Sequence, residues 1–363
     1  MRHILHVVGA RPNFIKAAPV LRALAARKGV RQTLVHTGQH YDVNMSDVFF
    51  RQLGMPKPDV SLGVGSGTHA AQTAQVLLGL EPVLRERKPD IVVVYGDVNS
   101  TMAAALAAVK LHIPVAHVEA GLRSGDREMP EEINRVITDA ISDLLFTPSR
   151  DGDENLRKEG VSSKRIRFVG NVMIDTLIRL LPAAKRPAEP RIAGPYVLVT
   201  VHRPANTDEP AGLAKLMRAL GAISTLAPVV FPIHPRTRAR LDKAGFKAPA
   251  GGRLRLIEPL GYLEFLALQR DAALVVTDSG GIQEETTFLG VPCLTVRTTT
   301  ERPVTVTAGT NKLVRDYANL PREAAAALRR ARKAAKPPKF WDGKAGERVA
   351  TGLLAWLAQR RAA

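Results

Sequence analysis

The sequence predicts an α/β protein with two doubly wound domains that face each other across a cleft. Short, continuous apolar runs alternate with alanine-rich helical segments along nearly the whole chain, and a proline-rich break divides this series in two. Strands that alternate with helices indicate parallel sheets covered by helices on both faces, where each strand reads as one apolar run. With 363 residues, 45% of them hydrophobic, the chain is long enough for about two such domains.

The elements follow from the local pattern. The predicted strands lie at residues 4–8, 31–35, 91–95, 115–118, 144–146, 166–169, 196–201, 229–233, 254–257, 274–277 and 293–296. Segments between them, such as 101–110 and 213–224, repeat their apolar residues with the period of a helix. Because ligands of doubly wound sheets bind outside the carboxyl ends of the strands, we expect the site in the cleft between the domains.

The break at residues 181–195 carries four prolines and no apolar period, and we interpret it as an interdomain linker. The expected domains are residues 1–175 and 190–344. A second proline break at 336–339 precedes the last helix, and we expect the segment 345–363 to cross back onto the first domain.

Composition excludes several classes of protein. No apolar run reaches the roughly 20 residues that span a bilayer, and the run in residues 1–12 is too short for a signal peptide. Cys293 is the only cysteine, so no disulfide within the chain is possible and a cytoplasmic setting is favoured. We interpret Cys293 as a small core residue.

The net charge of +18 raises the possibility of nucleic-acid binding, but its distribution argues against it. Residues 321–363 hold 11 Lys and Arg against 3 Asp and Glu, so +8 of the +18 lies in this segment. Aromatic residues make up only 5%, which is few for stacking on bases. A basic surface that attracts an acidic small substrate is the simpler explanation, and solvated helix faces explain most of these residues.

The most informative segment runs from Val275 to Val296. A buried strand ends at Asp278, and Ser279-Gly280-Gly281 then leads directly into a helix. The first N–H groups of such a helix bind anions, and glycines allow a phosphate to approach closely. A carboxylate one turn further, in Gln283-Glu284-Glu285, can accept hydrogen bonds from a ribose diol. The segment therefore predicts a site for a nucleoside diphosphate.

Charged residues also follow the strands of the first half. Arg11 and Lys16 open the first helix, where they can meet an anion or simply lie on the surface. Asp97, after Tyr95-Gly96, is placed either to cap the next helix or to take part in chemistry. Glu119 leaves a buried strand into a glycine turn, which is a poor place for full solvation and suits proton transfer. Glu131 follows Pro130 in a first helical turn.

His202 follows an apolar strand, and the abrupt change to Arg-Pro-Ala-Asn favours a loop over a core position. Two other patterns only weakly indicate a ligand site. The glycines of 63–67 follow no convincing strand, so they are a weak dinucleotide fingerprint. Asp151-Gly152-Asp153 looks like a helix cap more than a metal site. We expect no metal and no redox cofactor.

Taken together, these segments resemble the non-hydrolysing UDP-N-acetylglucosamine 2-epimerases over roughly residues 4–315. The matching motifs are Gly9-Ala10-Arg11-Pro12 through Lys16, Gly96-Asp97, His117-Val118-Glu119-Ala120-Gly121-Leu122-Arg123, Pro130-Glu131-Glu132-Ile133-Asn134-Arg135, Gly170-Asn171, His202-Arg203, Thr277-Asp278-Ser279-Gly280-Gly281-Ile282-Gln283-Glu284-Glu285 and Thr300-Glu301-Arg302-Pro303.

The resemblance implies two Rossmann-like domains in the GT-B-like arrangement, a homodimer and a UDP-sugar substrate. It implies that the UDP portion is held by Arg11, Ser279, Gly280, Gly281, Glu285 and Arg302. It implies a catalytic group made of Asp97, Glu119, Glu131 and His202. Lys16 matches a lysine that contacts substrate, and Phe265 an aromatic residue near the uracil.

The chain also departs from the family. Leu260 stands where members often carry a glutamine that contacts uracil. The runs 39–42 and 202–206 differ from those of members that their own substrate activates, which argues against allosteric activation here.

The expected reaction is reversible epimerisation at carbon 2 of UDP-N-acetylglucosamine, by elimination and re-addition of UDP through a 2-acetamidoglucal. We assign the two acid/base groups collectively to Asp97, Glu119 and Glu131, and His202 either to the diphosphate or to proton transfer. The alternatives are a GT-B glycosyltransferase that uses a UDP-sugar donor, a 2-epimerase for a modified UDP-2-acetamido sugar, a hydrolysing epimerase and a nucleic-acid-binding protein.

Overall fold

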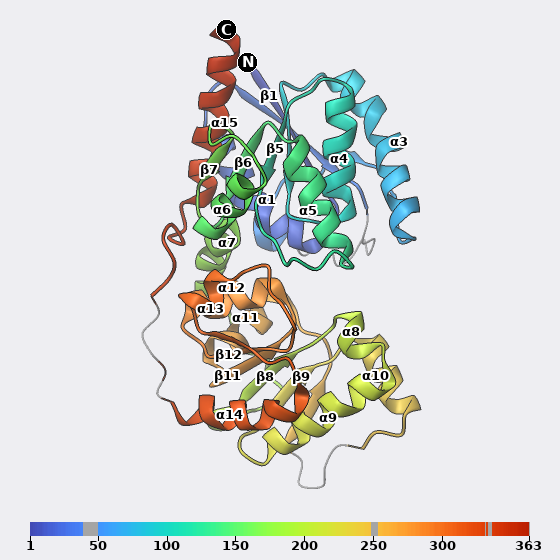
Figure 1. The fold of residues 1–363 in the computed structure, drawn as a ribbon, viewed down its shortest axis with the longest axis vertical. Helices are drawn as coiled ribbons and strands as arrows, with labels where there is room; N and C mark the ends of the chain where they lie inside the picture. The colour runs from blue at the N-terminus through green and yellow to red at the C-terminus, as the bar shows by residue number, and fades with distance from the viewer. Residues whose placement is uncertain (39–49, 248–252, 331, 333–335, 363) are drawn as a thin grey trace. The chain divides into compact units, whose positions relative to one another are not determined.

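The structure of the chain, a computed structural model, describes residues 1–363 except 39–49, 248–252, 331, 333–335 and 363. The chain forms two compact units. Unit 1 contains Met1–Arg179 together with Lys339–Ala363, and unit 2 contains Leu180–Pro338 (Figure 1). The predicted run 39–42 lies outside the described residues.

Unit 1 is built on one seven-stranded sheet in the order β3-β2-β1-β4-β5-β6-β7, in which all neighbouring strands are parallel. The strands are β1 (Arg2–Val8), β2 (Val30–His36), β3 (Val60–Ser61), β4 (Ile91–Tyr95), β5 (Val115–Val118), β6 (Leu144–Thr147) and β7 (Ile166–Phe168). The order reverses between β1 and β4, so loops on either side of this point diverge and leave room for a ligand.

The helices of unit 1 are α1 (Arg11–Ala25), α3 (His69–Arg87), α4 (Asn99–Lys110), α5 (Pro130–Ile141), α6 (Arg150–Lys158), α7 (Val172–Leu180) and α15 (Ala345–Ala362). Alanines of α4 and leucines of α3 pack on alternate residues of β1 and β4, among them Leu5 and Val92. Helix α1 packs against β1, β2 and β4, and α15 packs against α1 (Figure 1).

Buried hydrogen bonds join the C-terminal segment to the rest of unit 1. The carboxylate of Asp175, on α7, accepts hydrogen bonds from the N–H groups of Ala345 (3.1 Å) and Gly346 (2.7 Å), the first residues of α15. Trp341 donates its ring N–H to the carbonyl of Pro148 at 3.1 Å. Asp175 therefore satisfies N–H groups that the start of a helix leaves without partners.

Unit 2 contains a six-stranded parallel sheet in the order β10-β9-β8-β11-β12-β13. Its strands are β8 (Val197–Thr200), β9 (Val229–Pro232), β10 (Leu254–Ile257), β11 (Leu274–Thr277), β12 (Cys293–Thr295) and β13 (Asn311–Leu313). Its helices are α8 (Pro204–Thr207), α9 (Pro210–Ser224), α10 (Pro235–Lys243), α11 (Tyr262–Asp271), α12 (Gly280–Leu289), α13 (Val304–Thr307) and α14 (Leu320–Arg329), with 3-10 turns η1 (Leu181–Ala183) and η2 (Tyr317–Asn319).

Both faces of the second sheet are covered. Val197 and Val199 of β8 belong to a core with α9 and α14, whereas Leu198 packs on the opposite side with α11. Cys293 is buried in this second core, as predicted. The prediction of two doubly wound α/β units is therefore confirmed.

Two edge strands were missed. β3 has only two residues, and β13 reads Asn311-Lys312-Leu313, so neither shows the apolar run of a doubly covered strand. The glycines of 63–67 do follow a strand, β3, which corrects our interpretation of that segment. No helix in the described part of the chain is long and apolar enough to cross a membrane.

Candidate active site

In unit 1 the turn after β1 is tied to the end of β4 by Asn13. Its side-chain oxygen accepts hydrogen bonds from the N–H groups of Gly9 and Ala10, both at 3.0 Å, and its amide donates to the carbonyl of Tyr95 at 2.7 Å. Arg11 begins α1 directly after this turn and is exposed. Asn13, which sequence reasoning passed over, thus positions the two strand ends on either side of the reversal point.

Lys16 and Glu119 form a buried ion pair at 2.6 Å, with 3% and 4% of each residue exposed. Glu119 has φ +76°, a left-handed conformation that non-glycine residues rarely adopt. This conformation costs energy and persists only where surrounding contacts enforce it. A Cβ atom at Gly96 would lie 2.5 Å from Nζ of Lys16, and φ at this residue is +63°, so a larger residue would be strained and would displace the lysine from its ion pair. Glu119 lies beside a cation, which explains how it tolerates burial.

Asp97 is bound by Arg135 of α5, whose Nε and Nη2 atoms lie 2.9 and 2.7 Å from one carboxylate oxygen. The N-cap residue of α4 is Val98, the residue after Asp97, and its side chain makes no capping hydrogen bond. Asn134 donates to the carbonyl of Asp97 at 2.9 Å. Helix α5 therefore fixes both the backbone and the side chain of Asp97.

Glu131 and Glu132 lie in the first turn of α5, after Pro130. Glu131 is half-buried, whereas Glu132 is buried and accepts hydrogen bonds from the N–H groups of Ser124 (3.0 Å) and Gly125 (2.8 Å). Burial alone would raise the pKa of Glu132, but these bonds and Arg135 lower it below its ordinary value. Glu132 holds the loop that precedes α5, a role that sequence reasoning missed.

In unit 2 the loop after β8 is organised by Asp278, which sequence reasoning named only within a motif. Its buried carboxylate accepts hydrogen bonds from the N–H group of Arg203 at 2.8 Å and from the Asn206 amide at 2.8 Å. The N–H group of His202 also points to it, at 3.1 Å. The side chain of His202 is 56% exposed, so its predicted loop position is confirmed.

The start of α12 carries a buried guanidinium. Ser279 is the residue before the helix, and its side chain makes no capping hydrogen bond. A Cβ atom at Gly280 would lie 2.3 Å from Nη1 of Arg302, so Arg302 lies directly against the helix start. Arg302 is paired with Glu301 and, at 3.1 Å, with Glu284. Glu284 is thus a partner of Arg302, and Glu301 is a site residue that the motif alone did not explain.

Glu285 is the second carboxylate of this turn and is buried. It accepts a hydrogen bond from the hydroxyl of Tyr262 at 2.8 Å, and burial raises its pKa to about 7. Phe265 lies on α11, one turn after Tyr262, and packs half-buried against the core beneath α12. Leu260 packs against the same core.

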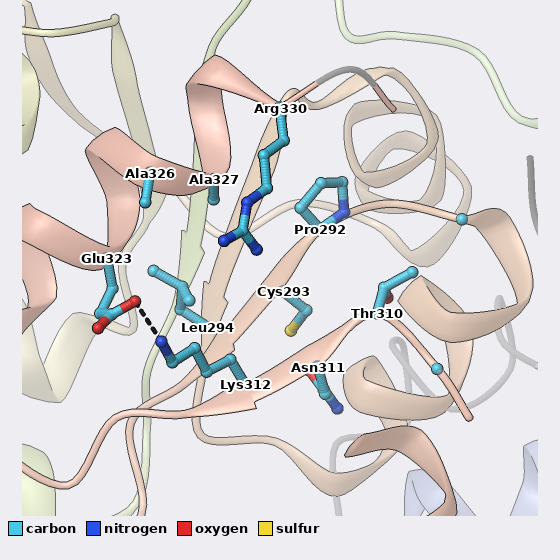
Figure 2. A pocket seen from close by; sticks show the side chains of 12 residues that line it. Pro292, Cys293, Leu294, Thr310, Asn311, Lys312, Glu323, Ala326, Ala327 and Arg330 are labelled. Carbon is cyan, nitrogen blue, oxygen red and sulfur yellow. Dashed lines mark hydrogen bonds and ion pairs between the residues drawn. The ribbon is translucent and has the colours of Figure 1, made fainter. Parts of the chain in front are cut away.

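The predicted residues of unit 2 do not line its cavity of about 610 Å³. This cavity lies between α14 and the amino ends of β12 and β13, where the ion pair of Lys312 and Glu323 spans 2.6 Å (Figure 2). The candidate residues follow the carboxyl ends of β8 and β11, the other edge of the sheet. Among the described residues no group of three His, Cys, Asp or Glu side chains could hold a metal ion.

Each unit therefore presents its own chemistry at the carboxyl ends of its strands. Unit 1 brings together the carboxylates Asp97 and Glu119, each beside a cation. Unit 2 offers the N-terminus of a ten-residue helix, a buried guanidinium and a buried carboxyl group. The first set can transfer protons, and the second can bind a phosphate and a ribose.

Comparison with known proteins agrees with this arrangement. The family model described as UDP-N-acetylglucosamine 2-epimerase matches residues 22–354. The UDP-2,3-diacetamido-2,3-dideoxy-D-glucuronate 2-epimerase of Pseudomonas aeruginosa is 47% identical over 86% of this chain and 88% of its own length. The UDP-N-acetylglucosamine 2-epimerase of Methanocaldococcus jannaschii is 43% identical over 94% of this chain and 96% of its own. The crystal structure of that enzyme in complex with UDP-GlcNAc and UDP has a TM-score of 0.89, with 98% of this chain and 100% of that chain covered.

Proposed function

Because this chain belongs to the UDP-N-acetylglucosamine 2-epimerase family, we propose that it inverts carbon 2 of a UDP-2-acetamido sugar. Its proposed reaction converts UDP-N-acetylglucosamine reversibly into UDP-N-acetylmannosamine, without a metal or redox cofactor. The observation that carries this proposal is the buried carboxylate of Glu119, held in a left-handed conformation beside Lys16 at the end of β5.

The proposed route is elimination followed by re-addition. The bond between the anomeric carbon and the UDP oxygen breaks, and its electron pair leaves with UDP. A carboxylate removes the proton from carbon 2, whose C–H electrons form the double bond of a 2-acetamidoglucal. A proton then adds to the opposite face of carbon 2, and the UDP oxygen adds back to the anomeric carbon. Water must be excluded meanwhile, because it would attack the positive charge that develops at the anomeric carbon, and the glucal must stay in the closed site until UDP adds back.

Two acid/base groups are needed, one for each face of the sugar, and we assign them collectively to Asp97, Glu119 and Glu131. Glu119 lies 2.6 Å from Lys16, and Asp97 lies 2.7 Å from Arg135, so each of these two carboxyl groups has a cation beside it. Lys16 is the proposed substrate-contacting lysine beside Glu119.

The UDP portion is the proposed ligand of unit 2. Ser279, the N–H groups of Gly280 and Gly281 at the start of α12, and the Arg302 guanidinium would stabilise the charge that grows on the leaving diphosphate. The N–H group of Ser279 itself donates to the Thr277 hydroxyl at 3.0 Å. A donor of this kind is typically worth about 3–4 kcal/mol. We assign the ribose to Glu285, the uracil to the surface near Phe265, and a further diphosphate contact to Arg11. His202 acts on the diphosphate or in proton transfer.

A second candidate substrate is a UDP-2-acetamido sugar with further substituents. The relative from Pseudomonas aeruginosa, named for a diacetamido glucuronate, is 47% identical to this chain. Incubating the protein separately with UDP-N-acetylglucosamine and with that uronate, and comparing kcat/KM by NMR, would decide between them. If neither sugar changes at carbon 2, the proposed function is wrong.

The mechanism has its own test. In heavy water the product should carry deuterium at carbon 2, and retention of the original hydrogen would exclude the proposed proton transfer. Glu119→Gln should lose turnover and still bind UDP, because the nucleotide contacts are assigned to unit 2. We also propose that the active form is a homodimer, which light scattering on the purified protein tests.

A further inference from the structure

A histidine and an aspartate form a fully buried pair beneath the turns that carry Asp97 and Glu119. His117 lies on β5 and Asp139 on α5, with 0% and 1% of each residue exposed. Nδ1 of His117 is 2.7 Å from one carboxylate oxygen of Asp139, and Nε2 is 2.7 Å from the carbonyl oxygen of Gly96. Neither residue is exposed enough to touch a substrate, so any role in the reaction is indirect.

The partners decide which atoms carry protons. The Gly96 carbonyl can only accept, so Nε2 of His117 donates to it. The second oxygen of Asp139 accepts from the Gly121 N–H group at 3.0 Å and from Nη1 of Arg123 at 2.7 Å, contacts that favour a carboxylate. The geometry therefore assigns Nδ1 of His117 as a donor to Asp139 as well. Although burial raises the pKa of Asp139, His117 and Arg123 hold it below its ordinary value.

Asp139 belongs to a network of charged side chains. Arg123, the cation beside it, is itself bound by both oxygens of Glu159, each at 2.7 Å. The buried carboxylate of Asp139 therefore has the Arg123 cation as a partner, and a buried charge is tolerated when it is paired and hydrogen-bonded. The network joins β5, α5 and Glu159, the residue that follows the last residue of α6.

Each member of the pair forms a hydrogen bond with the backbone of one turn. His117 holds the carbonyl of Gly96, the residue before Asp97, and Asp139 holds the N–H group of Gly121, two residues after Glu119. Gly96, Glu119 and Gly121 all have positive φ, at +63°, +76° and +81°. The two glycines adopt this conformation without strain, whereas Glu119 keeps it only when surrounding contacts enforce it. The pair supplies one such contact to each turn.

We propose that His117 and Asp139 are positioning residues that set the distance between the carboxylates of Asp97 and Glu119. This inference rests on the proposed function, because it assigns the pair to the acid/base group of that reaction. Misplacing a catalytic group by about 1 Å can cost about 100-fold in rate, so the expected loss is in kcat and leaves UDP binding unchanged.

Two matched variants separate positioning from folding. His117→Gln keeps a donor near the place of Nε2 and can still hold Gly96, whereas His117→Asn keeps one near Nδ1 and can hold only Asp139. Both lose the ring. We expect His117→Asn to lower kcat roughly 100-fold and His117→Gln less than about 10-fold, with KM and the Kd for UDP changed less than about 3-fold. Equal losses in the two variants, or no loss, would overturn the proposal.

A second readout does not require turnover. Hydrogen–deuterium exchange should accelerate in peptides over residues 94–99 in His117→Asn and over 119–123 in Asp139→Asn. Asp175→Asn is the matched control, since Asp175 is also a buried carboxylate that accepts backbone N–H bonds, but at α15. Unchanged exchange at both turns would overturn the proposal, even if the wild-type protein epimerises no sugar tested. An inactive wild type with the expected exchange would instead count against the proposed function alone.

Discussion

Nζ of Lys16 and Oε1 of Glu119 lie 2.6 Å apart although the two residues are 103 positions apart in the chain. Both side chains are buried, so removing one charge leaves the other with less compensation. We expect Lys16→Met to lower the free energy of unfolding by about 3 kcal/mol, measured by urea denaturation. The double variant Lys16→Met/Glu119→Gln should regain part of that loss. Equal stabilities of the single and the double variant would contradict this prediction.

Gly280→Ala should weaken UDP binding. The added Cβ would lie 2.3 Å from Nη1 of Arg302 and would displace the guanidinium from the start of α12. We expect the Kd for UDP to rise at least about tenfold in isothermal titration, the effect of losing one charge-assisted contact. Gly79→Ala, on α3, is the control, since a Cβ there would make ordinary contacts at 3.6 Å. An unchanged Kd in Gly280→Ala would remove Arg302 from the proposed site.

UDP binding should depend on pH through Glu285, whose pKa burial raises to about 7. Below that pH the side chain is a neutral carboxylic acid, and above it the carboxylate can accept hydrogen bonds from a ribose diol. The affinity for UDP should therefore rise between pH 6 and 8. Glu285→Gln has no such ionisation, and subtracting its profile removes the titration of UDP itself. Parallel profiles for the two proteins would show that Glu285 does not bind the ribose.

The free energy of unfolding should depend on pH through the ionisation of Asp175. Burial raises the pKa of Asp175 from 3.8 to about 6. A carboxyl group whose folded-state pKa is raised binds its proton more tightly in the folded protein than in the unfolded chain. Its favourable contribution is present in acid and is lost as pH rises from about 4 through 6, by about 3 kcal/mol.

Asp175→Asn isolates this contribution, because asparagine does not ionise. The stability of the wild type relative to Asp175→Asn should fall between pH 4 and pH 7, as measured by chemical denaturation at four pH values. A difference that stays constant with pH would mean that Asp175 titrates at its ordinary pKa in the folded protein.

The sequence predicted the central strands because they are buried on both faces and read as continuous apolar runs. It missed β3 and β13, which lie at sheet edges and need no such run. It also located the turns at Gly96, Glu119 and Ser279, since a break from apolar to glycine and charge marks the carboxyl end of a strand.

The partners of the charged residues were not predictable in the same way. By its place in the sequence, Asp97 could cap the next helix or take part in chemistry, and nothing local indicated Arg135 as its partner. Glu131 and Glu132 both followed Pro130 and were equivalent by pattern. The structure distinguishes Glu131 from Glu132, because the buried face of α5 contains Glu132 and Arg135, whereas Glu131 is half-buried.

The sequence by itself determined the fold class, the two series of strands and the turns at which chemistry can occur, because these depend on local periodicity and on the residues that end a strand. Only the tertiary structure decided which polar side chains pair: Lys16 with Glu119, Arg135 with Asp97, and His117 with Asp139. Ion pairing acts through space over a few ångströms, and residues far apart in a chain reach that distance only after the sheet has brought its strand ends together.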